Sequence, residues 1–314
     1  MRILVTGAYG FIGKSLCRAL SRYYTNVTGA VRFMQSPYHY DKINYVSVGD
    51  IALNPNWKNI LTDCDCVIHC AARTHIFNET KKNSLENYRL TNVKTTKILA
   101  EECVSAGVKR LIFLSSIGVL GVDTNNRKPF LYSDDPNPIE NYAISKFEAE
   151  KALFKISKNS SLETVIIRSP LVYGPSAPGN LESLIRFINS GAPLPFGRLT
   201  NERSFIGIDN LVDLIIRCIE HPDAAGKTFL VSDCEDLSIR KFIKLIASSM
   251  GRKTYLFPVP LFFLKILGFI FGKQREINKL ARSLRIDSNF TKETLSWTPS
   301  ISVEEGIKRM FQSK

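Results

Sequence analysis

The stretch Gly7-Ala8-Tyr9-Gly10-Phe11-Ile12-Gly13 decides the fold. It directly follows the short apolar run of residues 3–5 and leads into residues 14–24, which have helical spacing. Glycines permit a tight turn and let the backbone approach a pyrophosphate, which the N–H groups at the helix start would bind. A turn without a ligand would also use glycines, but the position between a first strand and a first helix favours a dinucleotide. We expect the cofactor to contact Gly7, Gly10, Phe11, Ile12 and Gly13.

Short apolar runs alternate with helical stretches from there to about residue 168. The runs are continuous rather than alternating, which is typical of strands buried on both faces. The pattern predicts an α/β fold, a Rossmann-type doubly wound parallel sheet. The predicted strands include residues 3–5, 27–31, 66–69, 111–114 and 164–167.

The sequence pattern changes beyond Tyr173, where Gly-Pro pairs break the chain into loops around one helix over residues 181–190. This predicts a smaller C-terminal, substrate-binding lobe over the carboxyl ends of the strands. We place the NAD(P)-binding domain at residues 1–172 and the lobe at residues 173–314. Residues 209–231 are expected to return to the first domain.

The composition of the chain limits which classes of binding partner we expect. The chain has 314 residues and a net charge of +13. Its Lys and Arg residues are spread along the sequence, which favours acidic small molecules over nucleic acid. No signal-peptide pattern opens the chain, so we expect a cytoplasmic protein with seven reduced cysteines. Cys64, Cys66 and Cys70 cluster, but no His or Cys pair at zinc spacing follows, so no metal is predicted.

An apolar run covers residues 256–272, but Pro258, Pro260 and Lys265 interrupt it, so it is too short to span a membrane. A helix over residues 261–271 could lie at a membrane surface, with nearby basic side chains on lipid phosphates. The alternative, which we favour at this point, is a core helix of the smaller lobe. Peripheral membrane contact, and hence membrane association, stays open.

Ser116, Tyr142 and Lys146 form the strongest catalytic pattern. Tyr142 and Lys146 are four residues apart and share a helix face, and Ser116 follows a predicted strand. A free tyrosine has a pKa of about 10. A neighbouring ammonium favours the phenolate, so we expect Lys146 to lower the pKa of Tyr142 toward the range of a general base. A surface Tyr–Lys pair is the simpler alternative.

Two residues bear on the choice of cofactor. The second strand ends in Arg32 rather than in the acid that would bind the ribose of NAD. Arg32 could pair with the 2′-phosphate of NADP, stack on adenine or be solvated, so NAD and NADP both remain open. Asp50 follows the third strand and could accept a hydrogen bond from the adenine amino group, or serve only as a turn residue.

Taken together, these motifs resemble the extended short-chain dehydrogenase/reductase superfamily, in the branch of NAD-dependent epimerases and dehydratases. They run in family order along nearly the whole chain. The matching pieces are Thr6-Gly-Ala-Tyr-Gly-Phe-Ile-Gly13, Gly49-Asp50, His69-Cys-Ala-Ala72, Ser115-Ser116, Tyr142-x-x-x-Lys146, Leu171-Val-Tyr-Gly-Pro175, Arg203-Ser-Phe-Ile-Gly-Ile-Asp209, Leu295-Ser-Trp-Thr-Pro299 and Ser302-Val-Glu-Glu-Gly306.

The resemblance implies a role for each site residue. Tyr142 would be the general base on a sugar hydroxyl, Lys146 would tune it and hold the nicotinamide ribose, and Ser116 would bind the same sugar oxygen. Asn180 and Arg203 match positions that bind a nucleotide diphosphate, and Phe196 lies in a segment expected along the nucleoside base. The remaining cofactor contacts implied are Ile51, Ala71 and Ala72.

Departures from the family pattern are informative. Related 4,6-dehydratases carry an Asp-Glu pair where this chain has Ile117 and Gly118, so dehydration is not expected. Leu171 replaces an asparagine that often contacts the sugar. A second arginine for the diphosphate is expected late in the chain, and Arg275, Arg282 and Arg285 are equally good candidates.

The leading hypothesis is a UDP-N-acetylhexosamine 4-epimerase (UDP-glucose type) for surface polysaccharide synthesis, including O-antigen, with a UDP or lipid-diphosphate carrier. The second is an NAD(P)H-dependent 4-keto-reductase that forms a 6-deoxy sugar of the quinovosamine type. A non-catalytic dinucleotide-sensing protein is a third, from another class. The resemblance also implies a homodimer, through residues 84–106 and 142–157.

Overall fold

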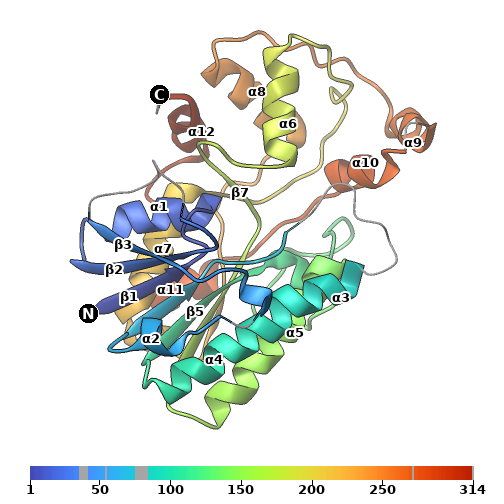
Figure 1. The fold of residues 1–314 in the computed structure, drawn as a ribbon. Helices are drawn as coiled ribbons and strands as arrows, with labels where there is room; N and C mark the ends of the chain where they lie inside the picture. Colours follow the sequence, from blue (N-terminus) through green and yellow to red (C-terminus); the bar gives the residue numbers. More distant parts are fainter. Residues whose placement is uncertain (35–41, 54, 75–83, 271, 313–314) are drawn as a thin grey trace.

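A seven-stranded parallel sheet forms the centre of the protein (Figure 1). The computed structural model describes residues 1–34, 42–53, 55–74, 84–270 and 272–312. Among these residues, the strand order is β3-β2-β1-β4-β5-β6-β9, the doubly wound arrangement. The predicted α/β, Rossmann-type fold is confirmed. The strands are β1 (Arg2–Thr6), β2 (Asn26–Val31), β3 (Ile43–Ser47), β4 (Cys66–His69), β5 (Arg110–Ser116), β6 (Glu163–Ser169) and β9 (Thr228–Leu230).

Helices cover both faces of this sheet, which is why its central strands carry continuous apolar runs (Figure 1). Ile3 and Val5 of β1 belong to one buried cluster, while Leu4 between them belongs to another. The first cluster is covered by α1 (Phe11–Leu20), α7 (Ile208–Glu220) and α11 (Asn289–Leu295). The second is covered by α2 (Lys58–Leu61), α4 (Thr95–Ser105) and α5 (Asn141–Lys158).

The first helix starts earlier than its apolar spacing predicts. It begins at Phe11 rather than at residue 14, because Gly10 takes the N-cap position with an extended backbone. Gly13 therefore lies inside the helix. Shorter elements precede and follow the larger ones: η1 (Ile51–Leu53), α3 (Ser84–Tyr88), the π-helix η3 (Arg89–Lys94), η4 (Ile117–Val119) and η5 (Pro222–Ala224).

A smaller lobe with its own apolar cluster sits beside the sheet (Figure 1). Phe205 and Phe242 stack in its core with ring centroids 4.3 Å apart. Phe11 packs against this core and against one core of the sheet, so the glycine loop lies at the junction of the two. The lobe contains β7 (Leu171–Tyr173), β8 (Phe205–Gly207), α6 (Asn180–Asn189), α8 (Ile239–Ser249), α9 (Leu261–Ile270), α10 (Gln274–Ala281) and α12 (Val303–Gln312). Within the segment 209–231, β9 pairs with β6 and α7 packs on α1.

Helix α9 is not the core helix that we favour from the sequence. Leu264 is buried, but Phe262 is 68% exposed and Phe269 is 73% exposed. The apolar composition of a segment reports how hydrophobic it is and not whether a partner covers it, so the sequence could not separate the two alternatives. In the part of the chain that the structure describes, no helix is both long and apolar enough to cross a membrane.

Candidate active site

The glycine loop fits the pyrophosphate of a dinucleotide. Gly7 has a φ of +69°, and a Cβ on it would lie 2.9 Å from backbone atoms of Ala71. A Cβ on Gly13 would lie 2.2 Å from the Gly7 carbonyl oxygen, so a side chain at either position requires the backbone to move. The N-terminus of α1 has no side-chain cap and no acid in its first turn. Its N–H groups and dipole can therefore bind an anion.

Arg32 and Asp50 meet at the ends of β2 and β3. The Arg32 guanidinium lies 3.6 Å from an Asp50 carboxylate oxygen, and the Arg32 side chain is 60% exposed. The other Asp50 oxygen accepts the Ala52 N–H at 2.9 Å, which closes a tight turn. Ile51, inside this turn, is half-buried against the core. Arg32 and Asp50 thus both make structural contacts at this end of the sheet.

Ser116, Tyr142 and Lys146 come together where β5 ends against the start of α5. Lys146 is buried, and its ammonium donates to the Leu114 carbonyl oxygen at 2.7 Å and lies 6.0 Å from the Tyr142 ring centroid. The Ser116 hydroxyl accepts the Gly118 N–H at 3.1 Å. Gly118 packs against Ala143, since a Cβ on it would lie 3.2 Å from the Ala143 Cβ. The turn that carries Ser116 therefore contacts the helix turn that carries Tyr142.

Burial dominates the electrostatics of this cluster. It raises the pKa of Tyr142 to about 12 and lowers the pKa of Lys146 to about 8. Burial, together with the positive charge of Lys146, also lowers the pKa of His69 to about 3, so this imidazole is neutral. The expectation that Lys146 lowers the pKa of Tyr142 is wrong, because this pKa is raised. The cause is the burial of the Tyr142 phenol itself, with a smaller contribution from the neighbouring Tyr88.

Lys146→Met is expected to make the cofactor-free protein more stable at pH 7, by up to about 3 kcal/mol. Below pH 8 the lysine is charged in both the folded and the unfolded state, so its burial lowers the free energy of unfolding. Between pH 8 and about 10.5 the folded state loses the proton first, and this cost disappears. Urea unfolding at pH 7 and pH 10 should show the gain shrinking at the higher pH. An equal gain at both would contradict the shifted pKa.

A buried ion pair that sequence reasoning missed anchors α5 on the sheet. Arg168 of β6 donates to Glu150 at 2.7 Å and 3.1 Å, and both side chains are almost fully buried. The Ser115 hydroxyl donates to the same carboxylate at 2.5 Å. Glu150 is one helical turn beyond Lys146, so the network fixes the helix face that carries Tyr142 and Lys146.

Asn92 is a second residue that the sequence patterns do not reveal. It is buried in the π-helix η3, where its amide donates to the Arg73 carbonyl oxygen and to the Ser145 hydroxyl, each at 3.0 Å. Its carbonyl accepts the Arg73 N–H at 2.8 Å. Asn92 thereby ties the loop of Ala71 and Ala72 to α5. A π-helix often marks a functional site, but it has no sequence signature.

The predicted substrate residues lie in or beside the smaller lobe. Asn180 is exposed at the first turn of α6, and Phe196 packs half-buried on the lobe core. Arg203 donates to the backbone carbonyls of Lys279 at 2.8 Å and Arg282 at 3.0 Å. No acidic side chain of the described residues forms an ion pair with Arg203. Burial lowers its pKa to about 10, so it stays charged at neutral pH and can bind an anion.

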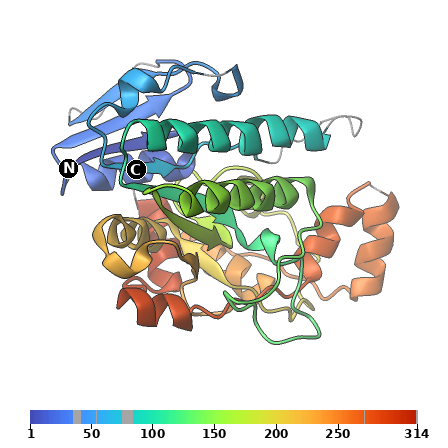
Figure 2. The ribbon, with the colours of Figure 1, turned by 90° about the horizontal axis from the view of Figure 1, so that it is seen from below.

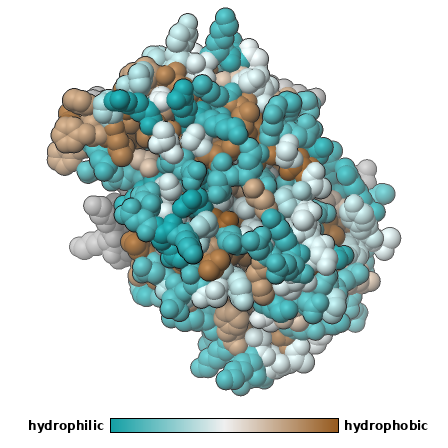
Figure 3. Space-filling model, turned by 180° about the vertical axis from the view of Figure 1, so that it is seen from behind, coloured by the Kyte–Doolittle hydropathy of each residue, from teal (hydrophilic) through white to brown (hydrophobic). Residues whose placement is uncertain are grey.

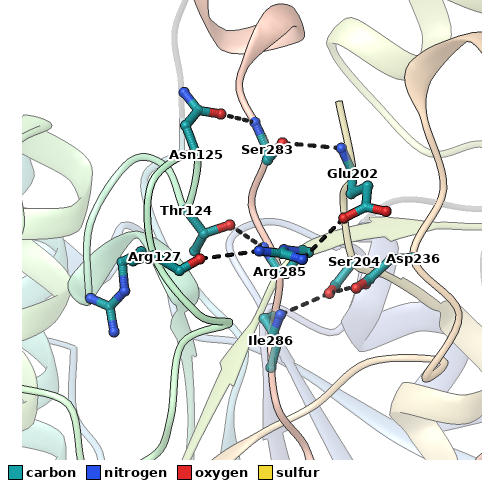
Figure 4. A network of polar contacts seen from close by, with 9 residues as sticks. All are labelled: Thr124, Asn125, Arg127, Glu202, Ser204, Asp236, Ser283, Arg285 and Ile286. Atoms are coloured by element: carbon teal, nitrogen blue, oxygen red, sulfur yellow. Dashed lines mark hydrogen bonds and ion pairs between the residues drawn. The ribbon is translucent and has the colours of Figure 1, made fainter. Parts of the chain in front are cut away.

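Two of the three late arginines can be compared. Arg285 forms an ion pair with Glu202 at 3.0 Å and donates to the Arg127 carbonyl oxygen, which places it in a structural network (Figure 4). This network clamps residues 283–286 between two chain segments. Arg282 has a weaker contact, 3.7 Å from Asp123. The Arg275 side chain lies outside the described residues. Of the two described candidates, Arg282 is the one more available to a ligand.

Comparison with known proteins identifies the family. The sequence profile of the NAD-dependent epimerase/dehydratase family matches residues 3–232. The chain belongs to this family. It is therefore an enzyme of the extended short-chain dehydrogenase/reductase type, and it depends on a nicotinamide dinucleotide. The resemblance described from the motifs is confirmed.

Members of the epimerase/dehydratase family resemble the chain over nearly its whole length. It is 41% identical to a UDP-glucose 4-epimerase of Vibrio cholerae, over 99% of this chain and 94% of that one. It is 25% identical to an Escherichia coli O157:H7 enzyme named N-acetyl-α-D-glucosaminyl-diphospho-ditrans,octacis-undecaprenol 4-epimerase, over 88% and 83% of the two chains. A solved UDP-glucose 4-epimerase from Thermotoga maritima, with UDP-glucose, shares the fold with a TM-score of 0.81, 22% identity and coverage of 99% and 97%.

Proposed function

We propose that this family member is a UDP-sugar 4-epimerase and that its substrate is a UDP-N-acetylhexosamine. The observation that carries the proposal is the meeting of Ser116, Tyr142 and Lys146 at the carboxyl end of β5, with the glycine loop at the same edge of the sheet. The 41% identity to a UDP-glucose 4-epimerase supports the reaction. The name of the Escherichia coli relative supports an N-acetylated sugar.

In the proposed reaction, Tyr142 takes the proton of the C4 hydroxyl and later returns it. NAD, held by the glycine loop from Gly7 to Gly13 and by Lys146, would supply the hydride chemistry at C4, and a positive charge beside Tyr142 would favour its phenolate. Ser116 orients the sugar oxygen through its hydroxyl, whose lone pair already accepts the Gly118 N–H. Arg203 holds the diphosphate while the 4-keto sugar turns, so that the hydride returns to the opposite face.

The residues after Ser116 support epimerisation over dehydration. Dehydration at C5 and C6 needs groups that move protons there. Ile117 is buried and apolar, and Gly118 packs against α5, so neither supplies such a group.

The test is to denature the purified protein and to identify the released nucleotide by mass, and then to assay UDP-N-acetylglucosamine without added cofactor. We expect about one NAD per chain and formation of the galacto epimer. An empty protein that consumes NADPH with a 4-keto sugar would instead support the 4-keto-reductase. Bound NAD without turnover of any UDP-sugar would support the dinucleotide-sensing alternative.

We also propose a homodimer through the paired helices at residues 84–105 and α5, which lie side by side (Figure 2). Leu90, Val104 and Phe154 are each about two-fifths exposed on these helices. Leu90→Glu/Phe154→Glu should convert the dimer to a monomer in sedimentation velocity. An unchanged sedimentation coefficient would exclude this surface.

A further inference from the structure

Helix α9 presents large apolar side chains to solvent. Phe262 is 68% exposed, Phe263 56%, Phe269 73% and Ile270 66%. A helix on the surface of a globular protein ordinarily turns its apolar stripe inward and its charges outward. In α9 most of the exposed side chains are apolar, and Figure 3 shows them as a brown projection at the upper left. A contiguous patch of this kind marks an interaction site.

Only a narrow row of residues along α9 contacts the rest of the lobe. Leu264 is buried in the lobe core, and Gly268, one turn further along, packs against α10. A Cβ on Gly268 would lie 2.6 Å from the Ile277 side chain and 3.1 Å from the Gln274 Cα. The two helices project together from one side of the lobe (Figure 1). The attachment therefore leaves the phenylalanines of α9 pointing outward.

The sequence around α9 is strongly basic. Residues 237–275 contain no Asp or Glu and eight basic residues, so they contribute +8 of the net +13. The basic residues are Arg240, Lys241, Lys244, Arg252, Lys253, Lys265, Lys273 and Arg275. Of these, Lys265 lies within α9 and Lys273 is the third residue after its end, and both are exposed. An apolar surface with exposed lysines on and beside it complements an apolar interior that is covered by anions.

We propose that α9 docks the protein on the surface of an anionic lipid bilayer. The phenylalanines would enter the boundary between headgroups and acyl chains, and Lys265 and Lys273 would contact lipid phosphates. The ten residues of α9 rise about 15 Å, whereas a spanning helix needs about 20 residues, so α9 lies in the plane of the interface. A second copy of the chain is a poorer occupant, because a symmetric contact would bring the lysines of both copies together.

The docking surface is mechanically connected to the candidate site. On α10, Lys279 forms an ion pair with Glu140 at 2.8 Å, and Glu140 directly precedes the helix that carries Tyr142. The carbonyl of Lys279 accepts from Arg203. Docking through α9 would thus hold the diphosphate-binding side of the site close to the bilayer. The docking proposal does not depend on which sugar the site takes.

Vesicle flotation of the full chain tests the proposal. The vesicles are phosphatidylethanolamine with phosphatidylglycerol, compared with pure phosphatidylcholine, each at low and high salt. We expect the wild-type protein to float with the anionic vesicles only, and less so at high salt. Phe262→Ser/Phe269→Ser should lower the partition coefficient at least about tenfold, because the variant loses the favourable free energy of transferring two phenylalanine side chains from water into the lipid. The activity of this double variant on a soluble substrate should be unchanged.

The matched control is Tyr23→Ser/Phe187→Ser, which removes two aromatic side chains of similar exposure elsewhere. This variant should float like the wild type. Wild-type protein that stays at the bottom with anionic vesicles overturns the proposal. So does equal flotation of the two double variants. A lower sedimentation coefficient of Phe262→Ser/Phe269→Ser, without lipid binding by the wild type, would instead assign the patch to a second copy of the chain.

Discussion

Tyr142→Phe is expected to lower kcat for 4-epimerisation by about 10²- to 10⁴-fold, the usual contribution of a positioned acid–base group. The substitution removes only the hydroxyl. The ring, which contacts Tyr88 edge-on with centroids 6.2 Å apart, keeps its packing, so the fold and the bound cofactor should be unaffected. The measurement is kcat and KM together with the amount of NAD released on denaturation. We expect a fall in kcat with little change in KM.

Tyr88→Phe is the matched control, because it removes the neighbouring phenol that donates to the Thr74 carbonyl oxygen. Its kcat should stay within about tenfold of the wild type, since nothing assigns this hydroxyl a proton to transfer. If Tyr142→Phe retained more than a tenth of the wild-type kcat, or if both variants lost activity equally, Tyr142 would not be the base.

Arg168→Met is expected to lower the free energy of unfolding by about 3–5 kcal/mol, the cost of leaving one partner of a buried ion pair uncompensated. The partner left behind is Glu150, whose side chain is 0% exposed. Urea unfolding followed by tryptophan fluorescence reports this directly, because Trp57 and Trp297 both pack in the cores of the main sheet.

Two further variants make the stability prediction specific. Glu150→Leu/Arg168→Met removes both charges and should recover most of the loss. Arg309→Met breaks an exposed pair with Glu305 and should unfold like the wild type. A loss below about 1 kcal/mol in Arg168→Met would contradict the account of this network.

The sequence predicts the sheet well because the patterns that specify strands and the loop after the first strand lie within short stretches of the chain. Continuous apolar runs mark the strands, and the position of Gly7 to Gly13 between strand and helix marks the loop that we predict to bind the cofactor. The pattern Tyr142-x-x-x-Lys146 likewise depends only on helical spacing, and the structure brings this pair to the end of β5 near Ser116.

What the sequence does not reveal depends on packing between distant segments. The ion pair of Glu150 and Arg168 joins a helix to a strand, and Asn92 acts from a π-helix whose formation no local motif announces. Helix α9 is exposed because α10 covers only a small part of its surface. The pKa of Tyr142 is decided by burial, which a four-residue spacing cannot report.

The most direct test of the central claim, a redox cycle that starts and ends at the same C4 carbon, follows the fate of the C4 hydrogen. The enzyme, without added cofactor, is given UDP-N-acetylglucosamine deuterated at C4, and the product is analysed by mass spectrometry. We predict the galacto epimer with the deuterium retained at C4, because the hydride never leaves the site. A product that has lost the deuterium, or the absence of any epimer, would contradict the account.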